Sequence, residues 1–234
     1  MNIIDFLLLL VLAVSVAFAL YRGSVASLLG LAACLVALVC ALYAGPRLAN
    51  ALGSNKGVTD LLTTYTDAGS LVGDYSLATT QVSGMSEATV DAVIKSVHLP
   101  DSMEQILRQN LTAQVFAAAG MRTVNDYISA TIVSVVLEAS SFVIAFLLCF
   151  LLLHMLINLI DHVYDFPVLT HFDGLLAAVF GLLRGVLVLY VLFLLVPLVR
   201  AMIPLDLLDT YLARSTFAPL FSSDSFFARV IGGM

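Results

Sequence analysis

The sequence predicts an all-α integral membrane protein with four spanning helices and a helical extramembrane segment between the second and third spans. Four long apolar stretches carry this prediction, at residues 3–20, 24–44, 128–160 and 175–199. A helix needs about 20 apolar residues to cross the hydrocarbon core, and each stretch reaches or approaches that length. The composition agrees, because 61% of the residues are hydrophobic, 11% are charged and the mean hydropathy is +1.06. A water-soluble chain could not cover so much apolar surface with so few charges.

The first two stretches are joined only by residues 21–24, which predicts a tight helical hairpin over residues 1–45. We expect Gly23 to take the left-handed conformation that ends a helix. We expect Ser24 to accept hydrogen bonds from the free N–H groups of the next helix. Because residues 1–5 hold an acid and no Lys or Arg, the first stretch is expected to be a retained span rather than a removable signal peptide.

Residues 46–127 are more polar, and we assign them to an extramembrane segment of amphipathic helices. Three groups of apolar residues follow the i, i+3, i+4, i+7 spacing of one helix face. They are Val58, Leu61, Leu62 and Tyr65; Val90, Val93, Ile94 and Val97; and Met103, Ile106, Leu107 and Leu111. Ser86 and Pro100 stand where the second and third helices would begin. We expect a small helical cap packed on the membrane bundle or its surface; an independent ligand-binding domain is the alternative.

The third and fourth spans fall within residues 128–200, and a C-terminal tail of residues 201–234 follows. The third stretch is longer than a bilayer requires. We therefore place its first part, up to Ala139 and including Glu138, outside lipid or at its edge, and the span itself at residues 142–160.

Arg184 is the sharpest anomaly of the fourth stretch. If the helix begins near Phe172, Arg184 lies near the middle of the membrane, where a lone Arg costs at least about 2.5–3.5 kcal/mol. It would need a water-filled cleft, backbone carbonyls or a carboxylate. The acids that could serve are Asp5, Asp161 and Asp173. In the alternative geometry, residues 173–183 lie along the interface and the span begins at Gly185.

Small residues mark places where helices could approach closely. Gly181 and Gly185 form a G-x-x-x-G row, and Gly23, Ser27 and Gly30 form a looser one. In lipid such rows let two helix backbones come together. They predict that spans two and four pack tightly, or that one of them forms a homodimer face.

A group of polar residues shares one helix face near the end of the third span. It consists of His154, Asn158, Asp161, His162 and Asp165. Such a mixture could bind a metal or relay protons, but we interpret it as the polar side of a helix that leaves the membrane. The sequence holds no H-E-x-x-H, G-x-S-x-G or phosphate-loop motif. We therefore predict a protein that is not an enzyme, with no catalytic residue, no metal site and no cofactor.

The charges indicate which partners to expect. A net charge of −6 and ten scattered Lys and Arg residues argue against nucleic acid. We expect the partners to be membrane lipids and other membrane proteins or a second copy of the chain. The orientation stays open, because Arg200, Arg214 and Arg229 favour a cytoplasmic C-terminus whereas Arg22 favours the opposite.

Short motifs stand in a recognisable order along the spans. They are Asp5 near the start, Arg22 and Gly23 after the first span, Gly30 in the second, and then Asp173, Gly174, Gly181, Arg184 and Gly185. In this order, over about residues 1–45 and 128–200, the chain resembles the colicin V production protein family of bacterial inner-membrane proteins. The resemblance implies a multi-pass protein of the bacterial plasma membrane that serves toxin biosynthesis or export, or envelope maintenance. It implies no known active site, so these residues carry over only as family-pattern and helix-packing positions.

We thus expect a non-enzymatic accessory protein. The alternative is a small oligomeric transporter or channel that uses Arg184 and the polar face from His154 to Asp165, since charges within a membrane often mark a substrate path.

Overall fold

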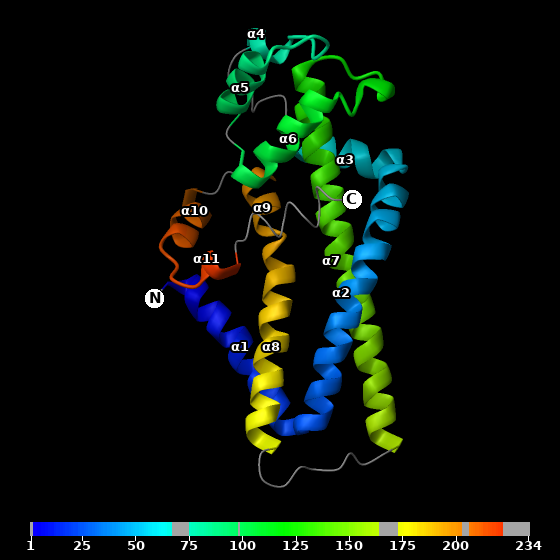
Figure 1. The fold of residues 1–234 in the computed structure, drawn as a ribbon, viewed down its shortest axis with the longest axis vertical. Helices are drawn as coiled ribbons and strands as arrows, with labels where there is room; N and C mark the ends of the chain where they lie inside the picture. Colours follow the sequence, from blue (N-terminus) through cyan, green and yellow to red (C-terminus); the bar gives the residue numbers. More distant parts are fainter. Residues whose placement is uncertain (1, 67–74, 98, 164–172, 203–205, 222–234) are drawn as a thin grey trace. The chain divides into compact units, whose positions relative to one another are not determined.

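The computed structural model describes residues 2–66, 75–97, 99–163, 173–202 and 206–221, and these residues form α-helices with no strand among them (Figure 1). Four helical segments are long and apolar enough to cross a membrane. They are α1 (Ile3–Arg22), α2 (Ser24–Gly53), α7 (Val124–Val163), and α8 (Asp173–Phe193) with the start of α9 (Val196–Met202). The predicted all-α membrane fold with four spans is confirmed.

The chain divides into two compact units, which are described separately. Within the described residues, the first unit contains residues 2–48, 141–163, 173–195 and 206–221. The second unit contains residues 49–66, 75–97, 99–140 and 196–202.

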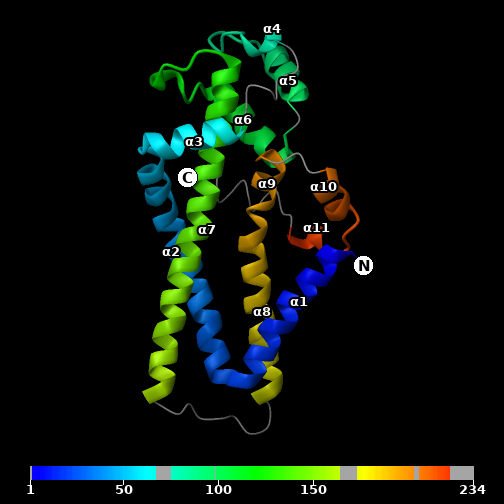
Figure 2. The same cartoon turned by 180° about the vertical axis from the view of Figure 1, so that it is seen from behind.

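In the first unit, α1 packs against α8, and α2 turns back from α1 through a single residue (Figures 1 and 2). That residue is Gly23, with φ 83° and ψ 170°. The positive φ agrees with the expectation, but the ψ value places Gly23 in an extended region that only glycine reaches, not in the left-handed helical region. Its N–H still ends α1, because it donates to the carbonyl of Ala19 at 3.0 Å.

Helix α2 continues past the predicted end of the span, through Pro46 to Gly53. Proline locks φ near its helical value, so it costs the helix one N–H bond and a steric adjustment rather than the whole turn. Gly45 lies directly against α7, since a Cβ atom there would be 3.3 Å from the Cα of Phe142.

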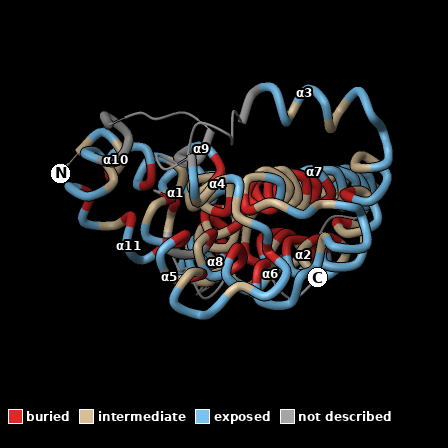
Figure 3. The backbone as a smooth tube through the Cα atoms, turned by 90° about the horizontal axis from the view of Figure 1, so that it is seen from above, coloured by how far each residue is buried: buried red, intermediate tan, exposed pale blue. Residues whose placement is uncertain are grey.

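Helix α7 is one continuous helix of 40 residues, of which residues 124–140 belong to the second unit and residues 141–163 to the first. Its first part is buried against protein (Figure 3), whereas its later part exposes large apolar side chains. The exposed ones include Leu147, Leu148, Leu151, Leu152, Met155, Leu156 and Leu159. Large apolar side chains exposed on successive turns are typical of a helix that faces lipid.

The second unit contains the amphipathic helices of the central segment. They are α3 (Lys56–Thr66), α4 (Tyr75–Ala78), α5 (Glu87–Ser96) and α6 (Asp101–Ala113), followed by the short 3₁₀ helix η2 (Ala117–Ala119). The predicted apolar faces of α5 and α6 are buried. The hydroxyl of Ser86 accepts from the Thr89 N–H, which confirms its position at the start of α5. The stripe of α3 differs, because Leu61 is 57% exposed even though α3 contacts α9.

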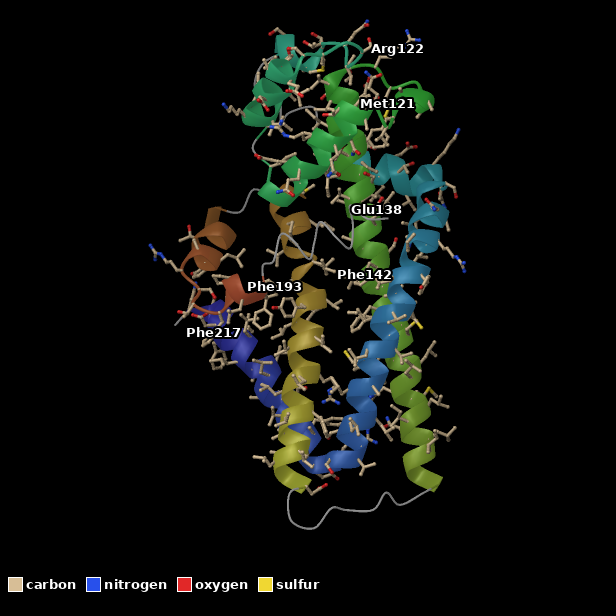
Figure 4. The ribbon with its side chains drawn as sticks, in the orientation of Figure 1. Met121, Arg122, Glu138, Phe142, Phe193 and Phe217 are labelled. Atoms are coloured by element: carbon tan, nitrogen blue, oxygen red, sulfur yellow. The ribbon has the colours of Figure 1, made fainter. Side chains whose placement is uncertain are left out.

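Two further helices, α10 (Asp206–Ala213) and α11 (Ala218–Phe221), belong to the first unit. There Leu8, Leu189 and Phe221 form a buried cluster, with Phe193 and Phe217 packed against it (Figure 4). The hydroxyl of Tyr190 donates to the carbonyl of Leu220 at 2.8 Å.

Candidate functional site

The two Gly-containing motifs of the sequence meet at one end of the first unit. Asp173 starts α8, and its Oδ1 accepts hydrogen bonds from the Ser24 N–H at 3.0 Å and from the Ser24 hydroxyl. A carboxylate at this position satisfies a free N–H of α2 and is favoured by the helix dipole. Ser24 was expected to accept such bonds, but it donates them, because an acid from a distant helix takes the capping role.

Glycine keeps this junction close. A Cβ atom at Gly23 would lie 3.2 Å from the Oδ2 of Asp173, which is tighter than an ordinary contact, whereas one at Gly174 would meet Leu20 at an ordinary 3.8 Å. The structure therefore joins the Arg22–Gly23 motif to the Asp173–Gly174 motif, which stand far apart in the sequence.

The G-x-x-x-G row of α8 faces α1. A Cβ atom at Gly181 would lie 2.5 Å from the Cβ of Ala19 and 2.9 Å from the Ser15 carbonyl oxygen. A Cβ atom at Gly185 would lie 3.0 Å from Leu12. The expectation that spans two and four pair through this row is wrong, because the first span supplies the complementary surface. The complementary surface was visible in the sequence as Ser15 and Ala19, a small-x-x-x-small row in the first span that was not predicted to pair.

Arg184 lies between these helices and is only 8% exposed. Its Nη2 donates to the Ser15 carbonyl at 3.2 Å and to the Ser15 hydroxyl at 3.3 Å, and its Nε is 3.4 Å from that hydroxyl. The Ser15 hydroxyl donates in turn to the carbonyl of Gly181 at 2.7 Å. The guanidinium carbon stands 5.5 Å from the ring centre of Phe18, within the range of a cation–π interaction.

The two candidate acids whose side chains are described are used elsewhere. Asp173 binds Ser24, and Asp5 binds residues near α11. Asp161 lies in α7, but its side chain is outside the described part. Among the described residues, Arg184 is therefore held by a hydroxyl, a carbonyl and an aromatic face rather than by a carboxylate.

The helix through Arg184 is continuous from Asp173, and no separate helix begins at Gly185. At 1.5 Å per residue, Arg184 lies about 16 Å from the start of α8. This matches the first of the two geometries considered for the fourth stretch. A second helix also approaches the guanidinium, because a Cβ atom at Gly30 of α2 would lie 3.1 Å from Nη1.

A pocket of about 280 Å³ opens beside Arg184 in the first unit. Its other walls include Val11, Val14, Phe18, Phe150, His154 and Val188. The ring of His154 packs 5.6 Å from the ring of Phe150 and 6.0 Å from that of Phe18, measured between centroids. The Nδ1 atom of His154 is buried and has no hydrogen-bond partner among the described residues.

Asp5 joins the first span to the C-terminal helices. It is fully buried, and its Oδ1 accepts from the Ser215 hydroxyl at 2.6 Å, the Thr216 N–H at 3.0 Å and the Phe217 N–H at 3.1 Å. Its Oδ2 accepts from the Asn2 N–H at 2.9 Å. From the sequence, Asp5 was a family-pattern position and a possible partner of Arg184, and its contacts with the C-terminal tail were not predicted.

The polar face near the end of α7 is only partly within the described structure. His154 is placed as above, whereas Asp165 and the side chains of Asp161 and His162 lie outside the described residues. Within the described part of the chain, no three His, Cys, Asp or Glu side chains come together as metal ligands would.

Comparison with known proteins gives one match. The model of the family described as Colicin V production protein matches residues 4–86 and 109–225. No curated protein and no solved structure matches the chain.

Proposed function

The chain belongs to the colicin V production protein family, and we propose that it is a non-enzymatic accessory protein of the bacterial plasma membrane that serves toxin biosynthesis or export, or envelope maintenance. Its family and its four apolar helices make it a multi-pass membrane protein. That the membrane is the bacterial plasma membrane, and that the role is an accessory one, is what we propose.

One observation carries the non-enzymatic part of this proposal: most of the family-pattern residues serve contacts between helices. Asp173 caps α2, Gly181 and Gly185 admit α1, and Asp5 holds the segment before α11. The serines beside these residues are bound as well, since Ser15, Ser24 and Ser215 each donate a hydroxyl proton within the fold. The group that activates a catalytic serine is typically a histidine or an amine, whereas Ser15 donates to a carbonyl, and Ser24 and Ser215 donate to carboxylates that also accept backbone N–H bonds.

The partners that we propose are lipids and other membrane proteins or a second copy of the chain. The exposed apolar side chains of α7, including Leu151, Leu152 and Met155, favour surroundings of lipid or of another membrane helix.

A complementation experiment tests this role. The gene is deleted in the host bacterium, and secretion of a colicin-type toxin and survival in detergent are measured. The wild-type gene should restore at least one of the two. A Gly181→Leu variant, which cannot pack α1 on α8, should restore neither, whereas Gly174→Ala, whose Cβ would meet Leu20 at an ordinary 3.8 Å, should restore as much as the wild type. The proposal is overturned if deletion changes neither trait.

The second candidate, a small oligomeric transporter or channel, is favoured by the buried Arg184 and the pocket beside it. Purified protein in liposomes should then move a solute, and Arg184→Ala should abolish that flux while the protein still accumulates. If Arg184→Ala prevents accumulation instead, the arginine is structural and this candidate loses its main support.

A further inference from the structure

We propose that the pocket beside Arg184 binds the carboxylate of a single-chain fatty acid, whose acyl chain leaves along the apolar walls into the lipid. This goes beyond the accessory role, and it can hold or fail independently of that role because it is measured on the purified chain.

The charge of Arg184 favours an anionic ligand. Arginine keeps its positive charge in proteins, and Arg184 is only 8% exposed between apolar helices. Its bonds to Ser15 use Nε and Nη2, and none to Nη1 is found among the described residues. A carboxylate is the anion whose planar shape fits a guanidinium best. Its binding would neutralise a charge that no described acid neutralises.

A polar atom of His154, unpaired among the described residues, favours a polar ligand in the same pocket. The Nδ1 of His154 is buried and unpaired in the described structure, and His154 lines the same pocket as Arg184. Buried polar groups almost always have hydrogen-bond partners. A carboxylate has two oxygens, so one can accept from the guanidinium, and the other can accept from a protonated Nδ1 of His154 once the ring turns that atom toward the pocket.

The size and the walls of the pocket favour a ligand with a single acyl chain. Its volume of about 280 Å³ lies just below the range of about 300–1,000 Å³ that is usual for ligand sites. That suits a small head group with the first part of one chain better than a phospholipid with two chains. Val11, Phe150 and Val188 supply apolar walls. Val14, which is 59% exposed, and Phe18, which is 42% exposed, lie at the open side where the chain can pass into lipid.

The test measures binding of radiolabelled palmitate to the full chain in a neutral detergent at pH 8. We expect saturable binding of one palmitate per chain. Unlabelled palmitate should compete, whereas methyl palmitate, which has the same chain without the charge, should compete at least tenfold more weakly. Absence of saturable binding, or equal competition by the ester, would overturn the proposal. So would equal competition by phosphatidylglycerol, because the site would then recognise a phosphate lipid.

Variants locate the site. Val188→Phe fills the pocket without touching the bonds of Arg184, and it should lower the affinity for palmitate at least tenfold. Val179→Phe is the matched control, because Val179 lies on the same helix, is 45% exposed and does not line the pocket. It should bind as the wild type does. If Val188→Phe fails to fold, His154→Leu decides: about tenfold weaker binding supports the proposal, and unchanged binding overturns it.

Discussion

Asp173 shows how single residues join parts of this chain that are distant in sequence. Its carboxylate takes the place of a local cap at the start of α2 and binds the N–H and hydroxyl of Ser24. Gly23 beside it has a backbone conformation that L side chains rarely adopt, and a Cβ atom there would press on the Oδ2 of Asp173 at 3.2 Å. The turn between the first two spans is therefore stabilised from a helix that begins 149 residues later.

The Asp173→Ala variant tests this cap. It leaves the Ser24 N–H without its partner, so we expect the free energy of unfolding in detergent micelles to fall by about 1 kcal/mol, as for the loss of other N-caps. Asp60→Ala is the control, since Asp60 lies exposed on α3. Equal stability of the two variants would show that Asp173 contributes nothing to the turn.

Arg184 is expected to behave in the opposite way. An Arg184→Met variant removes a buried charge and keeps a long apolar side chain at the same place. Removing one partner of a buried ion pair is costly because the other charge is left uncompensated, but no described acid binds Arg184, so this replacement leaves no such charge behind. We therefore expect the midpoint of thermal unfolding to stay the same or rise, while palmitate binding is lost. A large fall in the midpoint would mean that Arg184 is kept for stability rather than for a ligand.

The residue types in the sequence predicted which residues have special roles in this site, but not which residues they contact. The sequence identified Gly23 as a residue with positive φ, and Arg184 as a residue that needs polar company. It could not show that Ser15 would supply that company, because a serine in an apolar run looks like any small residue until the facing helix is known.

At the scale of elements, α1 and α8 pack closely together in the first unit. The two rows of small residues that face each other there leave no space for a methyl group at Gly181. The pairing of helices depends on both surfaces, so the G-x-x-x-G row alone indicated close packing without indicating the partner.

A pair of alanine substitutions tests this contact. Gly181→Ala would place its Cβ 2.5 Å from that of Ala19, so α1 must move away from α8. We expect a loss of about 1–3 kcal/mol, as for other overpacked sites. Gly174→Ala is the matched control on the same helix, because its Cβ would meet Leu20 at an ordinary 3.8 Å. Chemical unfolding in micelles measures both, and similar stabilities would contradict the packing described here.

The attachment of α10 and α11 depends on Asp5. In Asp5→Ala the Ser215 hydroxyl and the N–H groups of Thr216 and Phe217 lose their acceptor. We expect a protease to cut between α10 and α11 faster in this variant than in the wild type. Asp91→Ala removes only an exposed ion pair with Arg108 and should be cut at the wild-type rate. Unchanged cleavage of Asp5→Ala would show that other contacts hold these helices.

The helices themselves were easier to predict than their ends. Periodicity and capping residues located α5 and α6, because each buries one face and begins at a capping residue or a proline. The sequence placed the end of the second span too early. Helix α2 continues through Pro46, next to Gly45, where α7 packs closely against it.

At the scale of the whole molecule, the number of spans determines which segments share a side of the membrane. If each of the four apolar helices crosses the bilayer, the start of the chain, the central segment and the C-terminal helices lie on one side of it, and the turn at Gly23 lies on the other.

Cysteine labelling tests that premise directly. Cys34, Cys40 and Cys149 are first replaced by Ala. Single cysteines are then introduced at Thr112 in α6, at Tyr211 in α10 and at Tyr21 near the turn, where Tyr21 is 88% exposed. A maleimide that cannot cross membranes is applied to spheroplasts and to inverted vesicles.

We expect positions 112 and 211 to react in the same preparation and position 21 to react in the other. Reaction of position 21 from the same side as position 112 would contradict the four-span account, as would recovery of the labelled chain in the supernatant after ultracentrifugation without detergent.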